Sequence, residues 1–176
     1  MLRTPTLLVA FLLLLSLLVP GCSPAQPPRE IDLAELHDAV KAAYGEDYFA
    51  DMPMEREMFI EYFKLPGDKV EAFIAEIPML SMSVDTFVAV KATAGQGEAL
   101  ETALLAHRTY LIEESFQYPM NMPKVKASQV VRHGDYVFFL MLGAFNPDME
   151  ADEEAQLEYA REQVMKAVDA VDGFFA

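Results

Sequence analysis

The stretch QVVRHGDYVFFLML, residues 129–142, decides the fold because it is the clearest β-hairpin pattern in the chain. Its two runs are rich in β-branched and aromatic residues, and the link His133-Gly134-Asp135 is typical of a tight turn between antiparallel strands. Every residue from Tyr136 to Leu142 is apolar or aromatic, so both faces of the second strand must be covered. We expect helices on one face and either the N-terminal helices or a partner on the other.

A further strand and a long helix precede the hairpin. Thr86 to Ala92 alternates β-branched and aromatic residues with smaller ones, which predicts a strand. Gly95 and Gly97 then break the chain before an amphipathic helix predicted from Glu98 to about Phe116. The apolar spacing places four residues on the inner face of this helix: Leu100, Leu104, His107 and Leu111.

Proline pairs separate that helix from the hairpin, and a last helix follows the hairpin. Tyr118-Pro119 and Met122-Pro123 predict the end of the long helix, because the residue before a proline avoids the α region. Asp152 to Val171 has helical periodicity. Its predicted inward positions are Leu157, Ala160, Val164, Val168 and Val171.

The N-terminal half begins with helical patterns. Asp32 can cap a helix that runs from Leu33 through Tyr44, and a second helix is predicted from Met54 to Phe63. Val70, Phe73 and Ile74 then indicate another short turn of helix, although Phe73 to Pro78 could equally begin a strand. The whole order predicts one α+β domain over residues 31–176, with helices packed on an antiparallel sheet of three to four strands.

The amino terminus has the pattern of a secretion signal. Residues 1–21 combine Arg3 with a thirteen-residue run from Leu7 to Val19 that is apolar except for Ser16 and is too short for an ordinary transmembrane helix. Val19-Pro20-Gly21-Cys22 resembles the lipobox of bacterial lipoproteins. That resemblance implies cleavage before Cys22 and acylation of its thiol and new amino group. An ordinary signal peptide with an incidental cysteine is the alternative.

We therefore expect an exported protein that is anchored in the bacterial cell membrane and faces outside the cytoplasm. Several acyl chains on Cys22 would anchor it stably in the lipid bilayer. Residues 22–30 would then be the lipidated cysteine and a proline-rich tether.

Short segments of the chain resemble a known family. They are Ile77-Pro78-Met79 before the strand Phe87 to Lys91, Ser115-Phe116-Gln117-Tyr118 at the end of the long helix, and Gly134-Asp135-Tyr136-Val137 in the hairpin. Over roughly Ile31 to Gly143 the chain is similar to uncharacterised bacterial lipoproteins that carry domain of unknown function 4358. The resemblance supports a lipoprotein and implies no activity, substrate or catalytic residue.

Composition and charge exclude several classes of protein. The 176 residues are 53% hydrophobic and 23% charged, which is typical of a globular protein rather than a disordered one. The net charge of −15 argues against binding nucleic acid and against unaided docking on an anionic membrane. With a single cysteine, the chain forms no internal disulfide and no cysteine-rich metal site.

The sequence does not predict an enzyme or a bound cofactor. His37, His107 and His133 are scattered, and no serine lies in a Gly-x-Ser-x-Gly turn. His107 lies near the apolar face of its helix, where a structural role is favoured, and His133 is expected to be solvated in its turn. The acidic run from Asp148 to Glu154 could bind calcium, but its place before a helix favours interaction with the helix dipole.

Methionine is unusually frequent, with 11 residues in the chain. Thioethers are soft ligands that select Cu(I), and an exported protein could meet copper. The ordinary interpretation is that methionines fill irregular gaps in the core. The candidate metal ligands are Met52, Met54, Met79, Met82, Met120 and Met122.

These observations favour a non-catalytic, membrane-anchored module that binds an unknown protein or small molecule. The last strand and the segment from Tyr118 to Pro123 are the predicted contact surface. The alternative is a methionine-rich lipoprotein that handles copper, and an unrecognised hydrolase is the third hypothesis.

Overall fold

The predicted hairpin forms and lies within a larger antiparallel sheet. The computed structural model describes residues 30–79 and 82–176. Its strands are β1 (Met52–Pro53), β2 (Val70–Ile77), β3 (Thr86–Ala92), β4 (Gln129–His133) and β5 (Tyr136–Met141). They pair in the order β1-β2-β3-β5-β4, so the hairpin partner β5 also pairs with β3.

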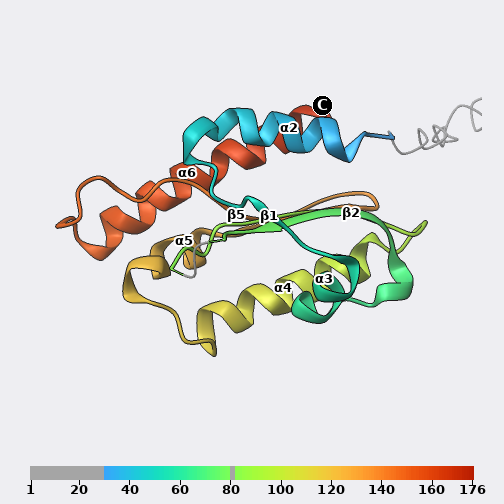
Figure 1. Cartoon of the computed structure of the whole chain (residues 1–176), viewed down its shortest axis with the longest axis horizontal. Coiled ribbons are helices and arrows are strands. Elements are labelled where there is room, and N and C mark those ends of the chain that lie inside the picture. Colours follow the sequence, from blue (N-terminus) through green and yellow to red (C-terminus); the bar gives the residue numbers. More distant parts are fainter. Residues whose placement is uncertain (1–29, 80–81) are drawn as a thin grey trace, which may run out of the picture.

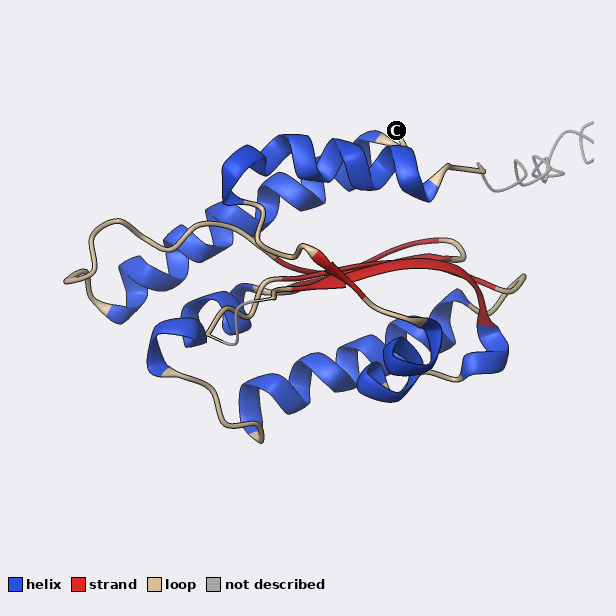
Figure 2. Cartoon of the chain, in the orientation of Figure 1, coloured by secondary structure: helices blue, strands red, loops and turns tan. Residues whose placement is uncertain are grey.

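Helices cover both faces of the sheet (Figure 1). The α-helices are α2 (Leu33–Tyr44), α3 (Arg56–Phe63), α4 (Gly97–Glu113), α5 (Met122–Ala127) and α6 (Glu153–Gly173). Short 3₁₀ turns are η2 (Gly45–Asp47), η3 (Gly67–Lys69) and η4 (Pro119–Asn121). Helices α2 and α6 lie on one side of the sheet, and α3 and α4 lie on the other (Figure 2).

Strand β5 is buried along its whole length, as the unbroken apolar run predicts. Phe138 and Leu140 pack with residues of α2 and α6, whereas Val137 and Phe139 pack with residues of α3 and α4. The cover on the second face therefore includes the N-terminal helix α2, and β5 is not available as a surface for a partner.

The α+β class is confirmed, but the sheet has five strands rather than three to four. Strand β1 was missed because two residues are too short to show alternation. Its Pro53 suits an edge strand, where a missing N–H leaves no unpaired acceptor inside the sheet.

Strand β2 replaces the short helical turn expected at residues 70–74, and the alternative strand over residues 73–78 is close to what forms. A register shift between Val70 and Ala72 disturbs the alternation at its start. Phe73 and Ile74 then pack against opposite cores, because the sheet is covered on both faces. Two adjacent apolar residues in a strand that is buried on both faces break the alternation of a half-buried strand, which is why the pattern resembled that of a helix.

Two helix boundaries also differ from expectation. Helix α3 begins at Arg56 rather than Met54, because β1 occupies Met52–Pro53. Helix α4 ends at Glu113 instead of Phe116. Beyond it, Pro119 and Pro123 open η4 and α5 rather than only stopping a helix, since proline is tolerated in the first turn.

The remaining helix predictions are confirmed. Asp32 caps α2 by accepting a hydrogen bond from the Ala34 N–H, at 2.7 Å. Asp152 caps α6 in the same way with Ala155, at 2.9 Å. The predicted signal peptide of residues 1–21, Cys22 and nearly all of the tether lie outside the described residues. Within residues 30–79 and 82–176, no helix is long and apolar enough to span a membrane.

Candidate functional site

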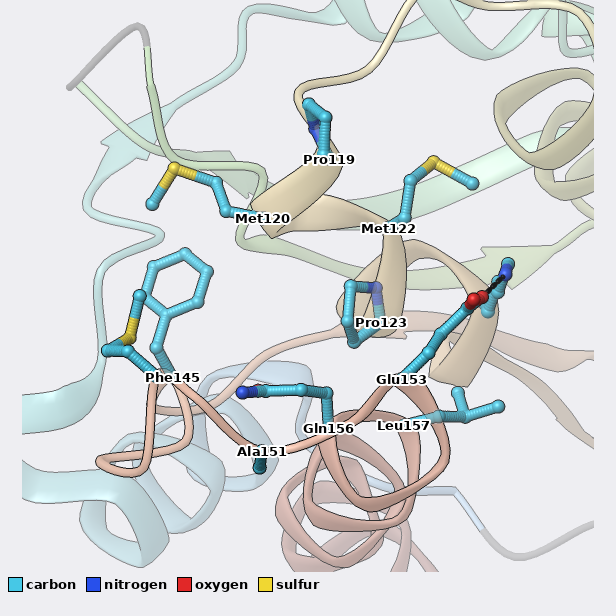
Figure 3. A pocket seen from close by; sticks show the side chains of 11 residues that line it. Pro119, Met120, Met122, Pro123, Phe145, Ala151, Glu153, Gln156 and Leu157 are labelled. Atoms are coloured by element: carbon cyan, nitrogen blue, oxygen red, sulfur yellow. Dashed lines mark hydrogen bonds and ion pairs between the residues drawn. The ribbon is translucent and has the colours of Figure 1, made fainter.

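A cavity of about 410 Å³ lies between α5 and the segment that joins β5 to α6 (Figure 3). We call it the Met-Pro cavity, because two prolines and three methionines form much of its wall. The lining residues are Pro119, Met120, Met122, Pro123, Lys126, Phe145, Met149, Ala151, Glu153, Gln156 and Leu157. Its volume is within the range of cavities that bind small molecules.

The wall of the Met-Pro cavity combines stiff and adaptable groups. Pro119 and Pro123 fix the backbone of η4 and the first turn of α5. Met120 and Met149 are exposed, and their unbranched thioethers can adjust to an irregular guest. Such a wall suits an apolar ligand better than a charged one.

The polar groups of the Met-Pro cavity are already engaged with protein partners. Lys126 Nζ lies 2.5 Å from Glu153 Oε1, and this ion pair joins α5 to the start of α6. The hydrogen bond and charge of Lys126 lower the pKa of Glu153, which is therefore ionised at neutral pH. The Gln156 amide donates to the Asp148 carbonyl at 2.7 Å. The cavity thus offers a short polar edge beside an apolar wall.

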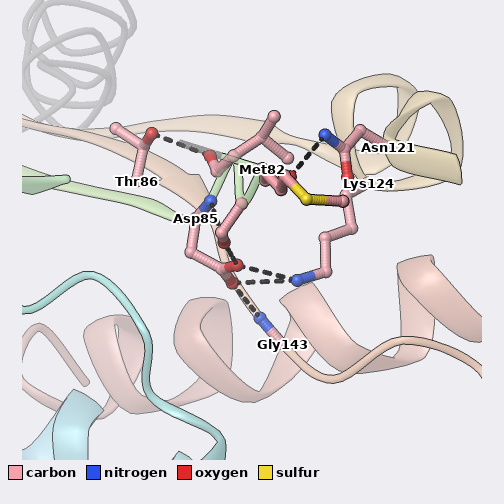
Figure 4. Close-up of polar contacts among 8 residues, drawn as sticks. Met82, Asp85, Thr86, Asn121, Lys124 and Gly143 are labelled. Atoms are coloured by element: carbon pink, nitrogen blue, oxygen red, sulfur yellow. Dashed lines mark hydrogen bonds and ion pairs between the residues drawn. The ribbon is translucent and has the colours of Figure 1, made fainter. Parts of the chain in front are cut away.

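A buried ion pair joins Asp85 to Lys124, the residue that follows Pro123 of the cavity wall (Figure 4). Asp85 is 0% exposed and Lys124 is 5% exposed. Lys124 Nζ donates to both carboxylate oxygens of Asp85, at 2.8 and 3.1 Å. The Gly143 N–H and the Ser83 hydroxyl also donate to this carboxylate, so its oxygens are well satisfied.

The ion pair also positions part of the cavity wall. Lys124 Nζ lies 4.2 Å from the centre of the Phe145 ring, within the range of a cation–π interaction. Phe145 lines the Met-Pro cavity, so one buried charge holds both α5 and an aromatic wall residue. The Asn121 side chain also donates a hydrogen bond to the Met82 carbonyl at 3.0 Å, which joins η4 to the segment before β3.

A second cavity, of about 530 Å³, lies beside α3 and α4. We call it the aromatic cavity, because Tyr62, Phe63, His107 and Tyr110 line it. The His107 ring contacts Phe63, with centroids 4.6 Å apart. The position predicted for His107, on the inner side of its helix, is therefore confirmed, although its ring also faces this cavity.

In the part of the chain that the structure describes, Ser115 and His107 both line the aromatic cavity but do not form a pair of nucleophile and base. Ser115 lines it together with His107, but the Ser115 hydroxyl donates to the Leu111 carbonyl and accepts from the Gln117 amide. Within the described residues, no hydrogen bond joins His107 to this hydroxyl. A nucleophile needs such a base to be activated, so the geometry does not favour the hydrolase hypothesis.

A family model matches residues 43–142, which is more than half of the chain, under the description "Domain of unknown function (DUF4358)". The chain belongs to this family. The match covers all five strands of the DUF4358 sheet together with α3, α4 and α5, and leaves α6 and most of α2 outside. No curated protein and no solved structure matches the chain.

The other two histidines of this DUF4358 protein have structural partners. His37 Nε2 lies 3.0 Å from Glu76 Oε2 and 3.1 Å from the Tyr48 hydroxyl. The Tyr48 hydroxyl also donates to Glu76, and burial and the Glu76 charge raise the pKa of Tyr48. This cluster joins α2 to β2, which were not predicted to meet.

The turn predicted a solvated His133, but the side chain has partners in the folded protein. It ends β4, stacks on the Phe175 ring with centroids 4.1 Å apart, and lies 2.8 Å from Asp172 Oδ1. The helix that brings Asp172 and Phe175 to this point comes from the far end of the chain. The pattern around the turn could not show that contact.

The six candidate metal ligands of the DUF4358 protein do not come together in one cavity. Met120 and Met122 line the Met-Pro cavity with Met149, which is not among the six candidates. The side chains of Met120 and Met122 extend to opposite sides of their turn (Figure 3). Of the other four, Met52 lies in β1, Met54 is buried in the core, and two are exposed: Met79 and Met82.

Hard-metal binding has no cluster to support it in residues 30–79 and 82–176. These residues contain no group of three or more His, Cys, Asp or Glu that could hold an ion. In the acidic run, Asp152 caps α6 and Glu153 pairs with Lys126. Both roles agree with the predicted function of this run at the start of a helix.

Proposed function

We propose that this protein is a non-catalytic, lipid-anchored binding module that acts outside the cytoplasmic membrane. The anchor rests on the sequence alone, through Cys22 and the apolar segment before it. The binding role rests on one observation, the Met-Pro cavity with its apolar wall and short polar edge. An uncharged apolar small molecule is the ligand class that this lining favours.

The location of the Met-Pro cavity supports this proposal. The contact surface predicted at Tyr118 to Pro123 contributes four of its lining residues: Pro119, Met120, Met122 and Pro123. Burial of an uncharged apolar guest against these side chains would be favourable by about 25 cal/mol for each Å² removed from water. The ion pair of Asp85 with Lys124 holds the wall in place before any guest arrives, which lowers the entropic cost of binding.

Filling the cavity tests the binding role. Ala151→Trp places a large ring in the Met-Pro cavity, whereas Ala155→Trp places the same ring on an exposed position of α6 that does not line it. The probe is the uncharged fluorophore N-phenyl-1-naphthylamine, added to residues 30–176 after a cooperative melt has shown that this part folds. Binding that Ala151→Trp abolishes and Ala155→Trp retains would support the proposal. Equal binding by both variants would place the probe elsewhere and contradict it.

The anchor has a separate test. Cells that express the full chain are grown with an alkyne analogue of palmitate, and the purified protein is examined for the label. We expect labelling of the wild-type chain and none of Cys22→Ser, because the thiol is the acylation site in the proposal. An unlabelled wild-type chain would refute the anchor and leave the cavity proposal intact.

Copper handling remains the alternative prediction. Three thioethers on one cavity are consistent with a soft ion, but the opposite directions of Met120 and Met122 do not favour their binding one ion together. The apolar-ligand proposal therefore accounts for the geometry better.

A further inference from the structure

The aromatic cavity has features that the Met-Pro cavity lacks. It is the larger of the two, at about 530 Å³, and a smaller cavity of about 220 Å³ continues from it past Tyr62 and Leu111. Tyr62 and Tyr110 are 49% and 45% exposed, so their rings are only partly used by the core. Large aromatic side chains left half in solvent beside a cavity are typical of binding sites rather than of packing.

The rings around His107 provide flat surfaces for a planar guest. The centroid of the His107 ring lies 5.2 Å from that of Tyr62 and 6.5 Å from that of Tyr110. Aromatic rings attract one another at separations of about 4.5–7 Å when they stack with an offset or meet edge to face. A planar ring that enters between Tyr62 and Tyr110 would meet such partners on more than one side.

His107 also has unused hydrogen-bonding capacity. Within the described residues, no hydrogen bond reaches either of its ring nitrogens. Burial and the nearby charge of Lys64 lower the pKa of His107 to about 4, so the ring is neutral at pH 7. A neutral imidazole offers one donor and one acceptor, and no described residue takes up either one of His107, which lines the cavity.

Lys64 gives this cavity a positive charge that has no counter-ion among the described residues. Its ammonium nitrogen lies 5.6 Å from the centre of the Tyr110 ring. No carboxylate of the described residues pairs with it, although the chain carries 28 Asp and Glu. An unpaired lysine at the edge of an aromatic cavity suits a ligand that brings its own negative charge.

The backbone at Lys64 strengthens this interpretation. Lys64 follows α3 as its C-cap residue with φ of 52° and ψ of 42°, and it is the one described non-glycine residue with a positive φ. Glycine would adopt this left-handed conformation at lower cost, because it has no Cβ to crowd the carbonyl oxygen. The chain therefore carries a strained backbone at the residue whose side chain lines the cavity, and strain of this kind is frequent at binding sites.

We propose that the aromatic cavity binds a small aromatic carboxylate. Its ring packs between Tyr62 and Tyr110 against His107, and its carboxylate pairs with the ammonium group of Lys64. All lining residues, from Tyr62 to Gln117, lie within the segment that matches the DUF4358 family. The proposal is independent of the Met-Pro cavity, since the two sites share no residue.

Calorimetric titration of the full-length chain in a non-ionic detergent tests this site. The probe is indole-3-acetate, and indole-3-acetamide and tryptamine are its neutral and cationic counterparts. We expect one molecule of indole-3-acetate to bind per chain with a Kd below about 1 mM, and both counterparts to bind more weakly. No binding of indole-3-acetate, or tighter binding of tryptamine, would overturn the proposal.

Variants at Lys64 separate charge recognition from a structural role. Lys64→Gln and Lys64→Gly should each weaken binding of indole-3-acetate by about tenfold, because a charge-assisted hydrogen bond is lost. The matched control is Lys69→Gln, which makes the same charge change on a residue that does not line the cavity. Lys64→Gly should also melt at or above the wild-type temperature, since the strain is relieved. Unchanged affinity in both Lys64 variants would overturn the assigned role of the ammonium group.

Discussion

The substitution Lys124→Met tests how the buried ion pair supports the fold. Methionine has nearly the length of lysine, so the change removes the charge of Lys124 and leaves its packing volume close to the original. Asp85, which is 0% exposed, would then retain only the Gly143 N–H and the Ser83 hydroxyl as donors. The cation above the Phe145 ring would also be lost.

The size of the effect follows from burial. Removing one partner of a buried ion pair typically costs about 3–5 kcal/mol, because the other charge is left without compensation in a medium that solvates it poorly. In a domain of about 150 residues, 1 kcal/mol shifts the melting midpoint by about 2–4 °C. We therefore expect Lys124→Met to melt about 6–20 °C below the wild type.

Thermal unfolding followed by circular dichroism measures this shift. Lys126→Met is the matched control, because Lys126 lies on the same helix and its partner Glu153 is exposed. We expect no measurable shift from the control, since exposed ion pairs contribute little. Combining Lys124→Met with Asp85→Asn should recover part of the loss by removing the stranded charge. A single variant that melts with the wild type, or a double variant no better than the single one, would refute the reasoning.

Two further predictions concern pH and packing. The folded pKa of His107 is about 4 and the unfolded value is about 6.5, so the unfolded state takes up the proton first as the pH falls. The free energy of unfolding should therefore fall between pH 6.5 and 4. In urea unfolding, His107→Gln should lose about 2 kcal/mol less of this free energy than the wild type over the same range, a value reduced for the part of the ring that faces solvent. In Gly97→Ala, the new Cβ would lie 2.2 Å from the Gly134 carbonyl oxygen, so we expect a loss of about 1–3 kcal/mol. If this variant were as stable as the wild type in the same assay, the hairpin turn would have moved to admit the new Cβ, and the prediction would be wrong.

Local patterns were sufficient wherever the fold depends on neighbours in sequence. The hairpin of residues 129–142, the caps at Asp32 and Asp152 and the inner face of α4 all follow from spacing over a few residues. Strand β1 and helix α5 were missed because two residues show no period and because prolines can begin a helix as well as end one. Their formation depends on the sheet edge and the core that they meet.

The polar networks could not be predicted for a different reason. Asp85 and Lys124 are 39 residues apart, and so are His37 and Glu76. Each pair joins a helix to a strand, or to the residue just before a strand, across the folded domain. The sequence pattern around each residue does not indicate which distant residue it will contact. Only the topology, which places α5 beside the start of β3 and α2 over β2, brings these polar groups together.

The candidate sites show the same division. The methionine and proline pattern at Tyr118 to Pro123 pointed to one wall of the Met-Pro cavity, whereas Phe145 and Met149 come from a segment without a recognisable motif. The aromatic cavity had one readable signal. His107 and Tyr110 are three residues apart and so lie on one face of α4. Large rings are uncommon on the solvated face of a helix, so this pair indicates a contact surface.

The two cavities also differ in their relation to the family. The Met-Pro cavity needs residues 145–157, which lie beyond the matched segment, whereas every residue of the aromatic cavity lies inside it. A relative that resembles this chain only over residues 43–142 would retain the helices α3 and α4 that build the aromatic cavity, and would lack one wall of the other. Recognition of an aromatic carboxylate would therefore belong to the shared domain, and capture of an apolar ligand to chains that add an α6-like helix.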